Sequence, residues 1–324
     1  MVDEQGFREM LVGREVPEDE IEAAIELVTR FEASREIDGA PAMREAAWAF
    51  SRRLSEEGLN TQENYVTLAR YGLFTRSDEL FVAILELLDG AEAQPNLYAR
   101  VGEVFGDKVR DEVFAGIGVA PLGLPTSDKP GAMHPVVQRL EAKVGAEACR
   151  ALLGDSLRDL PDEYYVQDQE RFAASRALDA YLQLRKQAFI ERLEACRDEG
   201  RLFFAQEIDD DVIDFVKSVP EMGGGRREGN VIYETKIPFL TKQYLTETDP
   251  VLKRYYYCHC PWAREGVKNG DVTLAPTFCN CSAGFHKKPW TVIYGERVRA
   301  EVLESVLMGD ERCRFAIRLP IVMD

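Results

Sequence analysis

This sequence of 324 residues has only three histidines, and it lacks the apolar run of about 18 residues that a membrane-spanning helix needs. Its first five residues show neither the basic start nor the apolar core of a secretory signal. We therefore expect a cytoplasmic protein with no membrane partner. In such a reducing compartment the seven cysteines are not expected to form a disulfide framework.

Basic residues are scarce relative to acidic ones in the first two-thirds of the chain. Residues 1–220 hold 25 of the 40 basic side chains but 44 of the 57 acidic ones, so the net charge of −17 arises there. An acidic body repels phosphate backbones, which argues against nucleic acid as a partner. Residues 222–227 form a glycine-rich stretch without the Lys-Ser/Thr of a phosphate-binding loop, and we expect a flexible turn.

The pattern of apolar residues predicts an α+β protein, with an N-terminal helical region and a C-terminal α/β domain whose antiparallel sheet ends in a hairpin. Helices are expected near 41–58, 61–72, 77–89, 96–116, 134–153 and 166–200. Gly and Pro residues at 118–131 indicate a boundary. We expect a helical domain (1–125), a helical segment that packs on the C-terminal domain (126–204) and a cysteine-rich α+β domain that binds a ligand or metal (205–324).

The C-terminal part alternates short strands and helices. Strands are predicted at 231–237, at 255–258, at 297–307 and at 313–319, with short helices at 262–268 and 278–288. In the last strand Phe315, Ile317 and Leu319 would lie on one face. Arg314 and Arg318 would lie on the other.

Scarce, reactive residue types are concentrated within residues 258–286. Four of the seven cysteines and two of the three histidines fall there, as Cys258-His259-Cys260 and Cys279-Asn280-Cys281, followed by His286. Thiolates and imidazoles bind zinc and related metals, and they also act as nucleophiles and bases. Metal binding, redox or nucleophilic chemistry without a metal, and buried inert thiols are all compatible with this pattern.

Local geometry narrows the choice of metal ligands. On a strand, Cys258 and Cys260 would share a face, whereas on a helix Cys279 and Cys281 would lie about 200° apart. The candidate ligands of zinc, with iron not excluded, are Cys258, Cys260, Cys279, Cys281 and Cys313. The catalytic candidates are Cys279, His286 and His259. The candidates for binding a small-molecule ligand are Tyr257, Trp262 and Arg264.

Some of these motifs resemble known families. The run Gly309-Asp310-Glu311-Arg312-Cys313-Arg314-Phe315 resembles the closing motif of the 4-vinyl reductase-type small-molecule-binding domain. The order Cys260-Pro261, Phe278-Cys279 and Gly309-Asp310 with Cys313 is similar to the aminothiazoline-carboxylate hydrolase family. The longer strings 257–262 and 278–281 resemble a bacterial family of unknown function.

The resemblance covers about residues 205–324. It implies a ligand-binding α/β fold, often with zinc and often dimeric, so a homodimer is possible. It also implies a catalytic cysteine at Cys279 in hydrolase-like members, and zinc on cysteines that include Cys313 in sensor-like members. Ser282 and Ala283 stand where the hydrolases carry an acidic residue, and Ser305 lies where the sensors carry a further cysteine.

Three functions follow from these observations. The first is a metal-dependent or cysteine-dependent hydrolase of a small molecule, with His286 or His259 as its base. The second is a non-catalytic sensor or carrier with a structural zinc. The third is a protein whose cysteines serve a redox dithiol or only the fold.

Overall fold

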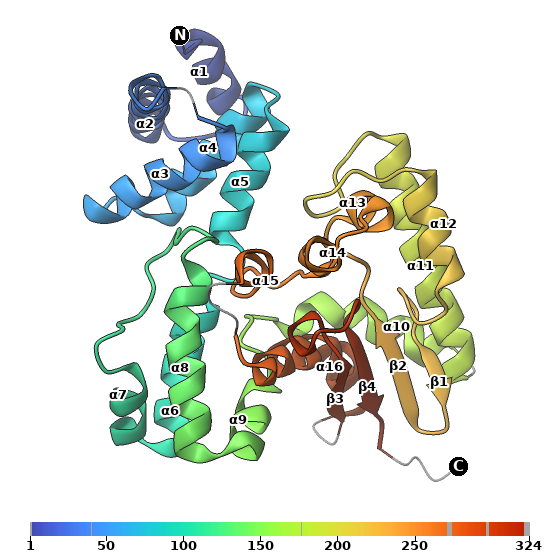
Figure 1. Ribbon diagram of the computed structural model, residues 1–324. Helices are drawn as coiled ribbons and strands as arrows, with labels where there is room; N and C mark the ends of the chain where they lie inside the picture. Colours follow the sequence, from blue (N-terminus) through green and yellow to red (C-terminus); the bar gives the residue numbers. More distant parts are fainter. Residues whose placement is uncertain (1, 40, 176, 271–273, 296–297, 321–324) are drawn as a thin grey trace. The chain divides into compact units, whose positions relative to one another are not determined.

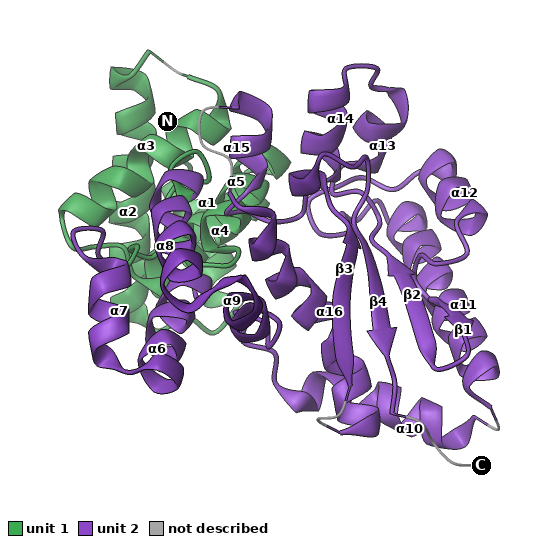
Figure 2. Ribbon diagram, turned by 60° about the horizontal axis from the view of Figure 1, so that its bottom comes forward, with its two compact units in different colours: residues 1–91, 119–129 green, residues 92–118, 130–324 purple. Residues whose placement is uncertain are grey.

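The computed structural model describes residues 2–39, 41–175, 177–270, 274–295 and 298–320 (Figure 1). It confirms the predicted α+β class, with helices throughout the N-terminal region and a four-stranded antiparallel sheet built from residues after 225. The chain divides into two compact units, which Figure 2 colours separately. Unit 1 comprises residues 1–91 and 119–129, and unit 2 comprises residues 92–118 and 130–324.

Unit 1 is a helical unit with a single apolar core. Three of its helices begin after a side chain that caps them, since Asp3, Thr61 and Ser77 each accept a hydrogen bond from a backbone N–H in the first turn. Phe31 and Phe50 pack edge to face in the core at 5.4 Å. The helices are α1 (Glu4–Val12), α2 (Glu18–Ile37), α3 (Met43–Glu56), α4 (Gln62–Phe74) and α5 (Asp78–Leu88).

The segment 119–129 returns to unit 1, although its Gly and Pro residues are typical of a linker. Ser51 Oγ donates to the carbonyl of Gly123 at 2.6 Å, beneath the Tyr65 hydroxyl. The buried Lys129 Nζ donates to the carbonyls of Glu86 and Asp89 at 3.0 and 2.8 Å, where α5 ends. Long-range hydrogen bonds therefore join this segment to unit 1, and the predicted domain boundaries at 125 and 204 stay predictions.

In the first part of unit 2, two glycines with nearly the same backbone conformation each separate two consecutive helices. The expected single helices at 96–116 and 134–153 are each divided, into α6 (Ala93–Phe105) with α7 (Asp107–Phe114) and α8 (Lys129–Val144) with α9 (Ala146–Leu153). Gly106 and Gly145 separate them with nearly identical dihedrals, φ 87° and ψ 156° against φ 84° and ψ 156°. This positive φ is open to glycine at little cost, so each glycine ends one helix and starts the next.

The sheet of unit 2 has the strand order β1-β2-β4-β3, with antiparallel neighbours. Its strands are β1 (Arg226–Glu228), β2 (Val231–Thr235), β3 (Arg299–Glu304) and β4 (Arg314–Arg318). β1 corrects the expected turn at 222–227, because its residues pair with β2 across Gly229 and Asn230. The alternation predicted for the last strand is confirmed, since Phe315 and Ile317 are fully buried and Arg318 is exposed.

Helices cover one face of this sheet (Figure 1). Ile232 of β2 and Ile317 of β4 are opposite each other and pack against Tyr181 and Trp290 from two helices. The remaining elements of unit 2 are η1 (Asp162–Tyr165), α10 (Val166–Ala174), α11 (Leu178–Asp198), α12 (Asp210–Ser218), α13 (Thr241–Thr246), α14 (Pro250–Tyr257), α15 (Arg264–Asn269), η2 (Pro276–Cys279), α16 (Asn280–Tyr294) and η3 (Val306–Met308).

The strand predicted at 255–258 is wrong. Residues 250–257 form helix α14, and Cys258 follows its last turn in an extended conformation. Asp249 accepts hydrogen bonds from Val251 N and Leu252 N at 2.8 and 3.0 Å, and Pro250 occupies the first turn. These helix-start signals outweigh the strand preference of three consecutive tyrosines.

No helix in the described ranges is long and apolar enough to cross a membrane.

Helix α16 packs closely against the turn after α9, which gives a test of the fold. A Cβ at Gly284 would lie 2.5 Å from Ser156 N and 2.6 Å from Gly154 O, both fixed backbone atoms. We expect Gly284→Ala to lower the free energy of unfolding by about 1–3 kcal/mol through overpacking. Gly131→Ala in α8 is the matched control, because its Cβ would meet nothing within 4 Å. Urea unfolding followed by tryptophan fluorescence measures the stability of both variants. Equal changes in the two free energies of unfolding would contradict the close packing of α16 on the turn after α9.

Candidate functional site

One stripe of helix α16 faces two polar residues of the sheet. Ser282, His286 and Trp290 recur every four residues, while Glu234 and Lys236 are two apart along β2 and its extension. The rise over two strand residues is about 6.6 Å and that over four helical residues is about 6 Å, so the two spacings match. Pairs therefore form in register, with Ser282 beside Lys236 and His286 beside Glu234.

Glu234 is a buried carboxylate that accepts three hydrogen bonds. Arg185 Nη1 and Trp290 Nε1 donate to its Oε1 at 3.0 Å each, and His286 Nδ1 lies 2.7 Å from its Oε2. Burial alone would raise the pKa of Glu234, but the Arg185 charge and the hydrogen bonds from His286 and Trp290 outweigh it and hold the pKa at about 2. The group is therefore ionised at neutral pH.

The ionised carboxylate fixes the tautomer of His286. Because a carboxylate can only accept, Nδ1 must carry the proton and Nε2 the lone pair. Among the residues that the structure describes, Nε2 is buried without a hydrogen-bond partner. The ring stacks on Phe315 with centroids 4.5 Å apart. Burial lowers the pKa of His286, and the hydrogen bond and charge of Glu234 oppose this only in part.

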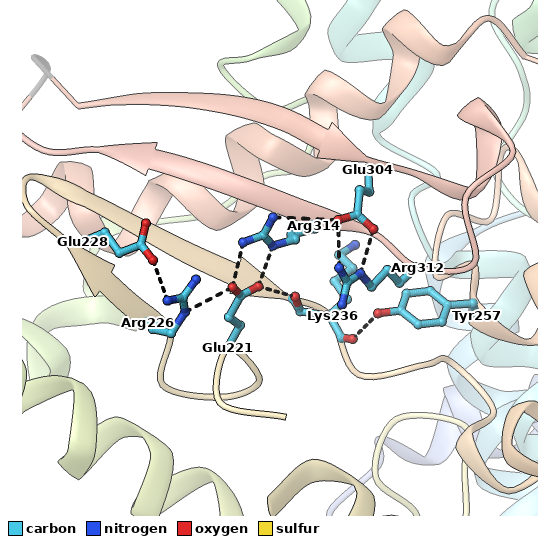
Figure 3. Close-up of polar contacts among 9 residues, drawn as sticks. Glu221, Arg226, Glu228, Lys236, Tyr257, Glu304, Arg312 and Arg314 are labelled. Carbon is cyan, nitrogen blue, oxygen red and sulfur yellow. Dashed lines mark hydrogen bonds and ion pairs between the residues drawn. The ribbon is translucent and has the colours of Figure 1, made fainter. Parts of the chain in front are cut away.

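Lys236 is positioned at the end of the helix-covered face. Its N–H donates to Cys313 O at 3.1 Å, which continues the β2–β4 pairing by one residue, and its own carbonyl accepts from the Tyr257 hydroxyl at 2.5 Å (Figure 3). Its Nζ donates to Ser282 Oγ at 2.6 Å. The Lys236 charge acts on the pKa values of both neighbouring histidines and of several thiols.

Four of the five predicted metal ligands, Cys258, Cys260, Cys279 and Cys313, lie near one another. Burial raises the pKa of the Cys258 thiol well above its ordinary value, and the nearby thiols of Cys260, Cys313 and Cys279 raise it further. Burial likewise raises the pKa values of Cys279 and Cys313, with Lys236 acting in the opposite direction on both. All seven cysteines are free.

Cys281, the fifth predicted ligand, belongs to a different environment. Its Sγ accepts a hydrogen bond from Leu157 N at 3.3 Å, so it faces the turn after α9. This separates it from Cys279, which interacts with the hydroxyl of Ser305. Within the described part of the chain, no three His, Cys, Asp or Glu side chains are grouped so that they could hold a metal ion. The predicted zinc site stays a prediction.

His259 is buried among aromatic rings. Its Nε2 lies 2.7 Å from the carbonyl of Ile237, and the rings of Phe239 and Phe204 stand edge to face at 5.3 and 6.3 Å. Burial, with the nearby Lys236 charge, lowers the pKa of His259 to about 3. The neutral imidazole is therefore the folded form at any physiological pH.

The three predicted ligand-binding residues are all buried. Tyr257 and Trp262 are 1% and 2% exposed, and Arg264 is 3% exposed with its guanidinium 4.1 Å from the ring centre of Phe239. Arg264 also lies over Tyr255, at 5.7 Å from the ring centre. Cation–π contacts of this kind stabilise a buried guanidinium. A ligand role for these residues stays a prediction.

The turn Gly309-Asp310, part of the motif that resembles known families, has a structural explanation. Asp310 Oδ2 accepts from Ser305 N at 2.9 Å, and Asp310 N donates back to Ser305 O at 3.1 Å. Gly309 has φ 95°, which only glycine adopts readily. The turn therefore places Ser305 against Cys279 and brings Cys313 to the start of β4.

A pocket of about 560 Å³ lies beside the turns that carry Cys279 and Ser305. Pro276 of η2 and Leu307 of η3 form part of its wall, opposite polar residues of α8 that include His134 and Glu141. The volume is in the range of small-molecule sites. None of the paired residues of α16 and β2 lines it.

The opposite face of the sheet carries an ion-pair network (Figure 3). Glu221 accepts two hydrogen bonds from Arg314 at 2.7 and 2.8 Å and one from Thr235 at 2.8 Å. Glu304 pairs in the same two-bond manner with Arg312, at 2.7 and 2.9 Å. These charges satisfy one another on a face where Glu221 and Thr235 are themselves buried.

The sequence reasoning missed Glu234, Lys236 and Ser282. Their residue types are common, and only the pairing of β2 with β4 and the helical phase of α16 bring them together. The available signal was the alternation within 231–237, which places residues 234 and 236 on the same face as Ile232. That face is the one that helices cover.

Comparison with known proteins gives one match. A family of unknown function (DUF6144) matches residues 242–322, which include every predicted site residue. No curated protein and no solved structure matches the chain.

The low pKa of His259 predicts acid sensitivity. Between pH 6.5 and about 3 the unfolded imidazole binds a proton that the folded one does not, so stability falls as the pH is lowered through this window. We expect His259→Gln, which keeps a donor for Ile237 O, to remove up to about 1.4 kcal/mol per pH unit from this slope. Urea unfolding at several pH values measures it. If His259→Gln and the wild type show the same change of stability with pH between pH 5 and 6, the low pKa of His259 is contradicted. Above pH 7.5 the two proteins should show the same slope.

Proposed function

We propose that this protein is a hydrolase of a small molecule, with the Glu234–His286 pair as its acid–base group. The observation that carries the proposal is the buried His286 Nε2, which has no hydrogen-bond partner in the described part of the chain while Nδ1 is held by a carboxylate at 2.7 Å. Such a nitrogen costs folding energy unless it has a function or a bound partner. A carboxylate-oriented imidazole is the usual arrangement of a general base.

The electrostatics also support this role. The imidazole is neutral at physiological pH because burial lowers its pKa, so it can accept a proton from water or from a nucleophile. The imidazolium that then forms is stabilised by Glu234, which stays ionised. Glu234 is a positioning residue in this scheme, and His286 is the group that transfers the proton.

Cys279 is the nucleophile that the sequence proposes. Its thiol is neutral because burial raises its pKa, so attack requires a base and a stabilising charge. The hydrogen bond with Ser305 and the charge of Lys236 both favour the thiolate. The free thiols also fit a reducing compartment, and we propose the cytoplasm as the site of action.

A second candidate function is a sensor or carrier with a thiolate-bound zinc. It is favoured by the mutual influence of Cys258, Cys260, Cys279 and Cys313 on their pKa values, which shows that these sulfurs are neighbours. The side chains would have to rotate into a tetrahedral set with bonds of about 2.3 Å. A redox dithiol drawn from the same four sulfurs is the third proposal.

The hydrolase is tested with a panel of chromogenic esters, amides and amidines. We expect His286→Gln to lower kcat by about 100-fold or more. Glu234→Gln should lower kcat and also lower the pKa of His286 in an NMR titration, since Glu234 raises that pKa. Lys288→Gln is the matched control on α16 and should keep full activity, because Lys288 pairs with Asp162 instead. Full activity of folded His286→Gln protein would overturn the proposal.

The zinc alternative is tested by metal analysis of protein purified from zinc-supplemented cells. If zinc is bound by the sulfur group, Cys260→Ser, Cys279→Ser and Cys313→Ser each lose it. Cys281→Ser should keep it, because Cys281 faces Leu157 instead. Wild-type protein without stoichiometric metal, or loss of metal in Cys281→Ser alone, would contradict this alternative.

A further inference from the structure

On the basis of the hydrolase proposed above, we further propose that Ser282 and Lys236 form a nucleophile–base pair, and that the substrate is an acyl compound whose acyl group Ser282 Oγ accepts. The pair is one helical turn from His286 on the same stripe of α16. Its two atoms, Nζ and Oγ, are 2.6 Å apart.

The surroundings of Lys236 differ from those of the buried Lys129 and the half-buried Lys186. Lys129 and Lys186 each give their hydrogen bonds to backbone carbonyls, which can only accept. Lys236 Nζ instead meets a hydroxyl, which can both accept and donate a proton. Lys236 has no ion pair with a carboxylate in the described part of the chain.

The surroundings of Lys236 also leave it without a carboxylate partner among the described residues. The lysine is half-buried. The nearest carboxylate along the strand, Glu234, is already engaged by Arg185, His286 and Trp290.

The chemical step is acyl transfer through a serine ester. The neutral amine of Lys236 takes the Ser282 hydroxyl proton as Oγ bonds to the carbonyl carbon. The bond to the leaving group then breaks, and the leaving group takes the proton from Lys236. Water next attacks the ester, and its proton passes to His286 Nε2. The Oγ–carbon bond then breaks, and Oγ takes that proton, which returns Ser282 and releases the acid. No oxidant, reductant or metal is consumed.

This arrangement also explains why the helix supplies two polar groups one turn apart. His286 lies on the same stripe as Ser282, on the side toward the C-terminus of α16, and Glu234 holds its orientation. An acyl group on Ser282 would thus lie near a second, independently oriented base. We assign nucleophile activation to Lys236 and leave to His286 the activation of water proposed above.

The experiment uses a fluorophosphonate probe on the full chain, with the modified residue identified by peptide mass spectrometry. We expect an adduct on Ser282, no adduct there in Ser282→Ala, and labelling slowed by about 100-fold or more in Lys236→Met. Lys236→Arg should be equally slow, because arginine keeps the charge and the hydrogen bond but does not give up its proton. Lys287→Gln is the matched control and should label at the wild-type rate.

Three outcomes would overturn the pair: an adduct on Cys279 instead, no adduct on folded protein, or wild-type labelling of Lys236→Arg. Turnover measurements distinguish failure of the hydrolase proposal from failure of the Ser282–Lys236 pair. If His286→Gln abolishes ester turnover while Ser282→Ala keeps it, the hydrolase stands and the Ser282–Lys236 pair falls. If Ser282 labels but His286→Gln keeps full turnover, the pair stands and the role of His286 falls. Circular dichroism of each variant confirms that it is folded.

Discussion

The buried carboxylate of Glu234 is the interaction on which the C-terminal arrangement depends. An unpaired carboxylate in this position would cost several kcal/mol, so its partners must stay in place. Those partners come from two helices, Arg185 from α11 and both His286 and Trp290 from α16. One ionised group therefore ties strand β2 to both helices, and it decides at the same time which nitrogen of His286 carries the proton.

The two faces of the sheet differ in how their polar groups are matched. On one face the acidic and basic groups satisfy one another in close pairs, such as Glu221 with Arg314. On the helix-covered face Lys236 meets a hydroxyl, and His286 keeps an unused lone pair in the described structure. Burying an unmatched polar group works against stability. This cost is the physical reason for proposing a functional role for His286.

The sequence was sufficient for the fold class, for the two-faced alternation of the last strands and for the region where reactive groups gather. It was misleading where local signals compete, as at 255–257, where three tyrosines favour a strand and Asp249-Pro250 starts a helix. It could not reveal Glu234, Lys236 or Ser282, because their proximity depends on strand pairing and helical phase over 46 and 52 residues of separation. Scarce residue types identify the neighbourhood of a site, and long-range geometry selects the working groups within it.

The thiols place a constraint on every function proposed for this region. Burial keeps them protonated, and the charge of Lys236 favours the thiolate without outweighing burial. A thiolate can form here only if a positive centre or a base compensates for it. A bound zinc would need several thiolates at once, whereas a cysteine nucleophile needs one that is free to attack. Cys279 cannot be a zinc ligand and a free nucleophile at the same time. A serine nucleophile with Lys236 as its base requires no thiolate. The thiols of Cys258, Cys260, Cys279 and Cys313 would then be available for a structural or regulatory role.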